Sequence, residues 1–198
     1  MSSREQILSQ IRKHLPQSTD LPEHDGEWTQ YPDPYEQFKS VLEGVGGICE
    51  TVRSVDEIPG RLSELNSEEL TVVSCVPGVF EDRFDLSTVS DPHDLQDVDW
   101  AILPGEVAVA ENAAIWVTDN NVPHRVLYFL SQYLVLIVPR SQLVNNMHEA
   151  YEKVDPSSRA FGTFISGPSK TADIEQSLVK GAHGARTLSV FFVEDLES

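Results

Sequence analysis

The chain is 198 residues long and has a formal net charge of −18, from 14 Lys and Arg against 32 Asp and Glu. A charge this negative repels phosphate backbones and anionic lipid, so we expect neither nucleic-acid binding nor membrane insertion. The 40% hydrophobic and 23% charged content is typical of a globular domain. A small anionic ligand stays compatible with this charge, because backbone N–H groups attract anions locally.

The sequence holds two cysteines, Cys49 and Cys75. Iron–sulfur clusters and structural zinc sites take about four ligands each, so we expect two reduced thiols, no cofactor and no metal. The first residues lack the apolar stretch of a secretory signal. The longest apolar run, residues 133–138, is far shorter than the ~20 residues that span a bilayer. These features predict a cytoplasmic protein.

The chain begins with the pattern of an amphipathic helix. Ser2 and Glu5 have the spacing of a capping box. Apolar residues then recur on one helical face, at Ile7, Leu8, Ile11 and Leu15. Residues 1–15 are therefore predicted to form a helix, which is either an appendage of the domain or a contact with a neighbouring subunit in a homo-oligomer.

A surface linker is predicted over residues 16–34, which are rich in Pro, Asp, Glu and Gly. Trp28 and Tyr31 are its aromatic residues, and we expect them to hold the linker against the domain. Residues 35–198 then form a single α/β domain.

Helical and β-branched apolar segments alternate within this domain. Helices are predicted at residues 35–45, 54–65, 143–154 and 171–180, with a short one after residue 125. Strands are predicted at residues 48–52, 70–76, 101–103, 107–110, 113–118, 134–138, 161–166 and 188–193. This order favours an α/β fold, in which helices cover a parallel sheet.

Residues 79–99 hold many carboxylates with little periodicity. Clustered carboxylates suit hard cations, so a metal-binding loop is one interpretation. The spacing does not match an EF-hand loop, and acidic runs are usually solvated surface. We therefore expect a surface loop.

The strand predicted at residues 161–166 runs into Gly167, Pro168 and Ser169, and a helix is predicted directly after them. The free N–H groups at the start of such a helix form a seat for an anion, and Lys170 adds a positive charge. The pattern resembles a P-loop, but Pro168 and Ser169 displace the lysine, which argues against nucleoside triphosphate hydrolysis.

Four residues of this segment are suited to stabilising the start of the predicted helix. Ser169 or Thr171 can cap it, and Asp173 and Glu175 fall in its first turns, where the helix dipole favours acids. A capped turn without any ligand therefore explains the same residues as well as an anion site does.

The second notable segment runs from Lys180 to Arg186. Gly181 and Gly184 suit a helix end and a tight turn, and they place His183 on a loop. His183 either acts as an acid–base group or polar anchor, or it caps helix carbonyls, which is the more common role of such a residue.

Residues 167–175 and 181–186 together resemble the C-terminal signature of the LUD-domain family, which includes the lactate-utilisation protein C group. About twenty residues agree in type and spacing, which makes the match specific. The resemblance implies the fold of ribose-5-phosphate isomerase, glucosamine-phosphate deaminase and CoA transferases, a three-layer α/β domain with a mainly parallel sheet covered by helices. It also implies a role in L-lactate oxidation beside iron–sulfur oxidoreductase partners.

Two further residues match the family pattern, Glu111 and Arg125. The family's Ala-Glu-Thr-Gly-Thr segment reads Ala-Glu-Asn-Ala-Ala at residues 110–114, so the acid is kept and the Thr-Gly pair is lost. The Pro and His that follow the arginine in the family are also replaced. The chain therefore resembles a divergent member.

Three functions follow as hypotheses. The first is an accessory or binding subunit of L-lactate oxidation, which seats a small anionic metabolite at residues 167–171, near Arg125 and His183. The second is an enzyme acting on a phosphorylated sugar or an acyl-CoA, with Glu111 as base or nucleophile. The third is a self-associating module with Trp28, Tyr31 and the first helix at its interface.

Overall fold

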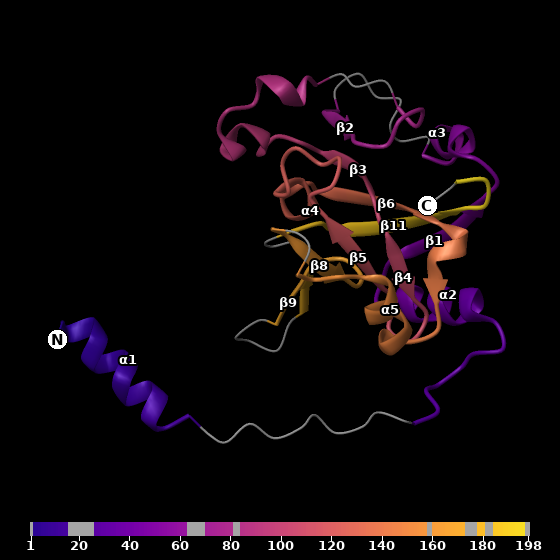
Figure 1. Ribbon diagram of the computed structural model, residues 1–198. Helices are drawn as coiled ribbons and strands as arrows, with labels where there is room; N and C mark the ends of the chain where they lie inside the picture. The colour runs from indigo at the N-terminus through magenta and orange to yellow at the C-terminus, as the bar shows by residue number, and fades with distance from the viewer. Residues whose placement is uncertain are drawn as a thin grey trace.

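The computed structural model describes residues 2–15, 26–62, 70–80, 84–157, 160–172, 178–180 and 184–196 (Figure 1). At its centre is a five-stranded sheet in the order β1-β11-β6-β3-β2, with every neighbouring pair parallel. The strands are β1 (Ile48–Val52), β2 (Val72–Ser74), β3 (Trp100–Pro104), β6 (Tyr133–Pro139) and β11 (Thr187–Val193).

The central strand β6 is buried on both faces of this sheet. Leu134, Leu136 and Val138 contribute to one hydrophobic cluster, and the alternate residues Val135 and Ile137 contribute to another on the opposite face. Successive side chains of a strand point to opposite faces. A strand covered on both sides must therefore be apolar at every position, which is why its sequence is an uninterrupted apolar run.

A second sheet packs against one face of the first. Its order is β7-β4-β5-β8, with strands β4 (Val107–Val109), β5 (Ala114–Thr118), β7 (Leu143–Val144) and β8 (Gly162–Ile165). The β4–β5 pair is antiparallel. The sequence pattern did not separate these strands from the parallel sheet, because apolar strands of both sheets have the same composition.

Helices cover both faces of the parallel sheet. On one face lie α2 (Pro34–Gly44), α4 (Leu127–Leu130) and the second sheet, and on the other lie the short helices η1 (Val55–Glu57) and α3 (Ile58–Arg61). Helix α5 (Met147–Lys153) covers the outer face of the second sheet. Three further 3₁₀ turns are η3 (Leu86–Thr88), η4 (Pro92–Leu95) and η5 (Arg140–Gln142). The predicted α/β class, a mainly parallel sheet with flanking helices, is confirmed.

Local signals in the sequence determine where α2 begins and ends. The Asp33 side chain accepts hydrogen bonds from backbone N–H groups of the first turn, and Pro34 occupies its first position. At the other end Gly46 has a φ of 89°, and the Gly47 N–H donates to the Leu42 carbonyl at 2.9 Å. This is a glycine-terminated helix end, as the Gly-Gly pair predicted.

Two predicted helices are shorter than their patterns. In place of the helix at 54–65, the described residues form only η1 and α3, and Ser54 makes no side-chain cap. In place of the helix at 143–154, Leu143 belongs to β7 and the helix starts at Met147, where Asn146 caps it through the Glu149 N–H. The apolar residue Leu143 satisfies a strand pattern as well as a helical one.

The helix predicted at residues 171–180 is wrong. Strands β9 (Lys170–Ala172) and β10 (Leu178–Lys180) form an antiparallel pair there, with Thr171 opposite Val179. Two β-branched residues in register favour strand pairing.

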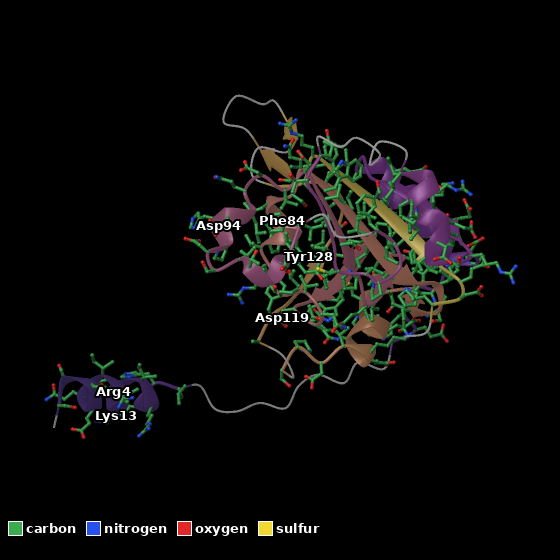
Figure 2. The ribbon with its side chains drawn as sticks, turned by 90° about the horizontal axis from the view of Figure 1, so that it is seen from above. Arg4, Lys13, Phe84, Asp94, Asp119 and Tyr128 are labelled. Carbon is green, nitrogen blue, oxygen red and sulfur yellow. The ribbon has the colours of Figure 1, made fainter. Side chains whose placement is uncertain are left out.

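The N-terminal helix α1 (Ser3–Lys13) forms with the predicted capping box between Ser2 and Glu5. It has no buried residue, and Ile7 and Ile11 are 61% and 54% exposed. Figures 1 and 2 show it apart from the sheets. An exposed apolar helix face is compatible with self-association, so a homo-oligomer stays a prediction.

The end of the predicted linker lies against the start of α5. The Trp28 ring stacks on His148 with centroids 3.4 Å apart, and the Tyr31 N–H donates to the Asn145 side chain at 2.9 Å. The Gln30 amide donates to the Glu149 carboxylate. Residues 28–31 are thus held against their own domain, as predicted, while residues 16–25 lie outside the described residues.

This contact predicts an acid-sensitive docking of residues 28–31. Burial alone would raise the pKa of Glu149, but hydrogen bonds from Gln30, Asn145 and Asn146 outweigh it and lower that pKa. The ionised Glu149 carboxylate therefore stabilises this contact fully above the ordinary Glu pKa of about 4.3. The stabilisation is lost as the pH falls through the lowered pKa of Glu149. We expect the indole N–H resonance of Trp28 to shift over that range in the wild-type protein. The shift should be absent in Glu149→Gln and present in Glu152→Gln, and equal titrations in all three would contradict the assignment.

The second prediction concerns the core. Phe192 is fully buried, and its ring meets those of Phe38 and Tyr35 at 5.0 and 5.8 Å. Phe192→Ala should lower the free energy of unfolding by about 3–5 kcal/mol, because it leaves a cavity. The exposed Ile7→Ala should change it by no more than about 0.5 kcal/mol. Urea denaturation compares the two variants.

Candidate functional site

Four segments that the sequence singled out converge beside the amino ends of β6 and β11. They are the β4–β5 turn at residues 110–113, residues 129–132 before β6, the β8–β9 turn at residues 166–169, and residues 184–186 before β11. We call these four segments the motif cluster. Parallel strands present their amino ends at one edge of a sheet, so elements that lead into them meet there.

The β8–β9 turn contacts two of the other segments directly. The Ser166 hydroxyl donates to the Asn112 carbonyl at 2.7 Å, and the Ser169 N–H donates to the Ala185 carbonyl at 2.8 Å. A Cβ at Gly184 would lie 3.0 Å from the Ser169 Cβ, so these two residues are also in contact. The two halves of the C-terminal signature are therefore neighbours in space.

The segment before β6 completes the cluster. The Arg186 N–H donates to the Gln132 carbonyl at 2.7 Å, and a Cβ at Gly184 would lie 3.5 Å from the Phe129 carbonyl oxygen. This segment overlaps residues 130–134, where the Pro and His of the family pattern are replaced in this sequence. The replaced positions thus lie inside the same site as the retained ones.

Glu111 belongs to this cluster, but its carboxylate accepts a hydrogen bond from the start of a helix. It is exposed, and it accepts the N–H of Met147, the first residue of α5, at 3.1 Å. A carboxylate at a helix N-terminus satisfies a free N–H group and complements the helix dipole. The structure therefore assigns Glu111 a capping contact that the sequence did not predict.

Arg125 lies beside one segment of the cluster, because the Phe161 ring that it contacts is 6.4 Å, centroid to centroid, from the ring of Phe129. Its guanidinium lies 5.6 Å from the centroid of the Phe161 ring, just before the first residue of β8. Ser166 follows the last residue of β8, so Arg125 and the β8–β9 turn lie at opposite ends of one strand. The contact with Phe161 is a cation–π interaction.

The predicted seat of free helix N–H groups is wrong, because strand β9 replaces the helix. The Ser169 N–H is bonded to Ala185, and Pro168 has no N–H to offer. Lys170 and Arg186 are exposed and leave positive charge at the cluster. Thr171 lies in β9. Asp173, Glu175 and His183 lie outside the described residues, so their ligand contacts stay predictions.

Sequence reasoning missed a cavity of about 510 Å³ at the opposite edge of the sheet, beyond the carboxyl ends of β2, β3 and β6. Its polar residues follow strand ends, as Glu106 does after β3 and Asn120 and Asn121 do after β5. Ligands of open α/β sheets bind outside the carboxyl ends of strands. That rule, applied to the polar residues after each predicted strand, could have found it.

Within the described ranges, no group of three or more His, Cys, Asp or Glu side chains is arranged to hold a metal ion. Asp85 and Asp91 of the acidic stretch instead cap η3 and η4. Neither cysteine is in a disulfide, with Cys49 buried and Cys75 half-buried. No helix in the described part of the chain is long and apolar enough to cross a bilayer.

An α/β domain with these converging signature segments defines a recognisable class. The LUD domain family model matches residues 79–193, more than half of the chain. The chain therefore belongs to the LUD domain family.

The curated relatives that match this chain carry a more specific name than the family does. "Lactate utilization protein C" of Geobacillus thermodenitrificans is 36% identical over 99 residues, which is 46% of this chain and 40% of that protein. The protein of the same name from Shouchella clausii is 32% identical over 102 residues, 49% of this chain and 44% of its own length. The matched part thus spans less than half the length of these relatives. The lactate utilization protein C of an Exiguobacterium strain aligns over 99% of this chain and 98% of its own, at 25% identity.

One solved structure supports the fold. A DUF162 family protein from Deinococcus radiodurans superimposes with a TM-score of 0.60 at 20% identity, over 81% of this chain and 96% of that one. The likeness shows a shared fold. Kinship with the isomerase and CoA-transferase folds stays a prediction from the sequence.

Gly167 offers a test of the motif cluster. Its φ is 76°, and a Cβ there would lie 2.7 Å from Cγ2 of Val45. Gly167→Ala should therefore destabilise the protein by about 1–3 kcal/mol, through backbone strain and overlap. Gly44→Ala is the matched control, since a Cβ at Gly44 meets nothing within 4 Å. Equal midpoints in urea for the two variants would show that the turn does not have this geometry.

Proposed function

We propose that this chain is an accessory binding subunit in L-lactate utilisation, and that it holds a small anionic metabolite at the motif cluster. The observation that carries the proposal is the convergence of four separate signature segments at one edge of the sheet, in a chain of the LUD domain family. Packing alone does not require exposed polar turns to meet in this way. A ligand shared by all four segments supplies a reason.

The ligand contacts in this proposal come from side chains and not from a helix terminus. Lys170 and Arg186 are exposed at the cluster, and their charge is local in a chain with a net charge of −18. Charged hydrogen bonds to a carboxylate or phosphate are stronger than neutral ones. The cluster therefore favours a small anion despite the long-range repulsion of the chain.

Iron–sulfur oxidoreductase subunits are the proposed partners. The chain holds only two cysteines, of which Cys49 is buried, so it does not offer the thiolates of a cluster. Electron transfer in this proposal therefore belongs to other subunits. Glu111 gives little support to an enzyme that uses it as base, because its carboxylate already accepts the Met147 N–H.

Growth on L-lactate tests the role. Deleting the gene in a strain without another L-lactate oxidase should abolish growth on L-lactate and leave growth on glucose unchanged. Wild-type growth on L-lactate after the deletion would refute the role in lactate utilisation.

Complementation of that deletion tests the site. The double variant Lys170→Glu with Arg186→Glu should fail to restore growth, since it reverses the local charge. Arg53→Glu, which changes a 79% exposed side chain far along the sequence from the cluster, should restore it. If the double variant restores growth at wild-type protein levels, the motif cluster is not the anion site.

A further inference from the structure

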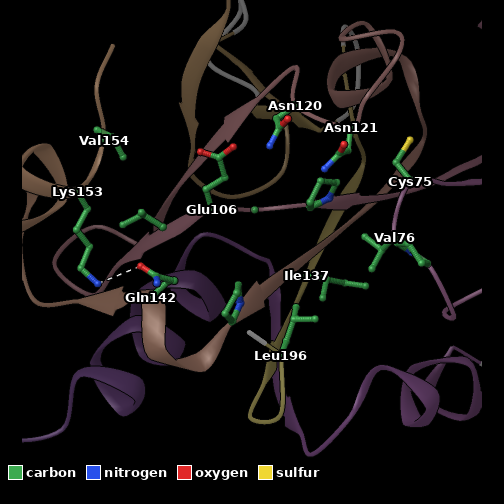
Figure 3. A pocket seen from close by; sticks show the side chains of 15 residues that line it. Cys75, Val76, Glu106, Asn120, Asn121, Ile137, Gln142, Lys153, Val154 and Leu196 are labelled. Carbon is green, nitrogen blue, oxygen red and sulfur yellow. Dashed lines mark hydrogen bonds between the residues drawn. The ribbon is translucent and has the colours of Figure 1, made fainter. Parts of the chain in front are cut away.

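The cavity at the carboxyl edge of the parallel sheet is a second site, separate from the motif cluster. Its volume of about 510 Å³ lies within the ~300–1,000 Å³ that small-molecule sites have. The residues that line it come from six places in the sequence: Cys75, Val76 and Pro77; residues 104–107; Asn120 and Asn121; Ile137, Pro139 and Gln142; Lys153 and Val154; and Leu196. Figure 3 shows their arrangement.

One wall of the cavity is polar and hydrogen-bond accepting. The Thr118 hydroxyl donates to Oε1 of Glu106 at 2.6 Å, which orients the carboxylate. Figure 3 shows Asn120 and Asn121 on the same side as Glu106. Asn121 has a φ of 58°, a left-handed conformation that asparagine adopts more readily than most residues. A carboxylate beside two carboxamides is suited to binding hydroxyl groups.

Buried contacts hold this wall in place. The Tyr128 hydroxyl lies 3.2 Å from the Pro104 carbonyl oxygen and 3.1 Å from that of Thr118, and so joins the ends of β3 and β5. Burial raises the pKa of Tyr128, and nearby Cys75, Glu106 and Asp119 raise it further, so the hydroxyl stays protonated and keeps donating. Gly105 lets the strands approach, because a Cβ there would lie 2.6 Å from Cγ2 of Ile115.

The opposite wall carries a positive charge. The Lys153 ammonium donates to the Gln142 side chain at 3.0 Å, across the cavity from Glu106 (Figure 3). An ammonium group has three donors, so this bond leaves donors for a ligand. The apolar side chains of Val76, Ile137 and Leu196 line a further part of the cavity, and Figure 3 shows them on the side away from Lys153.

We propose that this cavity binds a hydroxylated organic anion, with its hydroxyl groups on Glu106 and the two asparagines and its anionic group on Lys153. The carbon skeleton of the ligand then lies against the apolar residues that line the rest of the cavity. A three-carbon hydroxy acid such as lactate fills only a small part of this volume of about 510 Å³. The ligand is therefore a longer sugar acid or sugar phosphate, and the site is distinct from the one proposed for lactate utilisation.

Calorimetric titration of the full chain tests the ligand class. D-gluconate and D-ribose 5-phosphate carry hydroxyls with a carboxylate or a phosphate, whereas hexanoate lacks hydroxyls and glucose lacks charge. At least one of the first two should bind about tenfold more tightly than hexanoate and glucose. Whichever of D-gluconate and D-ribose 5-phosphate binds more tightly shows whether the site prefers a carboxylate or a phosphate. No binding of either at millimolar concentration, or equal binding of all four, overturns the proposal.

Matched variants test the residues. Glu106→Gln and Lys153→Met should each weaken binding about tenfold or more, while Glu43→Gln and Lys13→Met, which lie outside the cavity, should not. Unchanged affinity in both cavity variants refutes the assignment.

Cys75 provides a readout that needs no variant. It lines the cavity and is half-buried, whereas Cys49 is buried and burial raises its pKa to about 11, so alkylation should favour Cys75. A saturating ligand should slow iodoacetamide modification of Cys75 several-fold and leave Cys49 unaffected. An unchanged Cys75 rate with bound ligand places the ligand elsewhere. If the cavity binds one of the hydroxylated anions and the gene is nevertheless dispensable for growth on L-lactate, this inference holds and the proposed function fails.

Discussion

The parallel pairing of β6 with β11 is the interaction on which the rest of the structure depends. Seven residues of each strand are in register, from Tyr133 opposite Thr187 to Pro139 opposite Val193. Both strands are buried on both faces, so a shift by one residue would move every side chain into the wrong cluster. This pairing therefore holds the two edges of the sheet in a defined geometry.

Both candidate sites depend on that geometry. Residues before β6 and β11 meet at the amino edge, where Arg186 bonds to Gln132 and Ser169 to Ala185. Residues after β3, β5 and β6 meet at the carboxyl edge and line the cavity. The family signature lies at the amino edge, whereas ligands of open α/β sheets usually bind at the carboxyl edge. The chain thus presents two sites with different chemistry, an exposed turn cluster and a cavity that is partly open to solvent.

The sequence predicted the features that depend on residues close together in the chain, and it missed those that depend on contacts between distant residues. The strands of the parallel sheet were found because burial on both faces requires an apolar run, as in β6. Helix α2 was found because its apolar residues recur on one face and the Gly-Gly pair ends it within one turn, whereas the Asp33 cap was seen only in the structure. The helix predicted after Ser169 was wrong because Thr171 pairs with Val179, a partner eight residues away that helical periodicity does not consider. Glu111 was recognised as notable, but its bond to Met147 joins residues 36 apart.

The sequence by itself determined the α/β class, most strands, the cap of the first helix and the segments that carry the family signature. Each of these depends on residues close together in the chain, where spacing and side-chain type are sufficient. Only the tertiary structure decided that β4, β5, β7 and β8 form a separate sheet, that the signature segments meet, and that Glu106 faces Lys153 across a cavity. Those outcomes depend on which strands lie side by side, and apolar strands that are alike in sequence do not encode their neighbours individually.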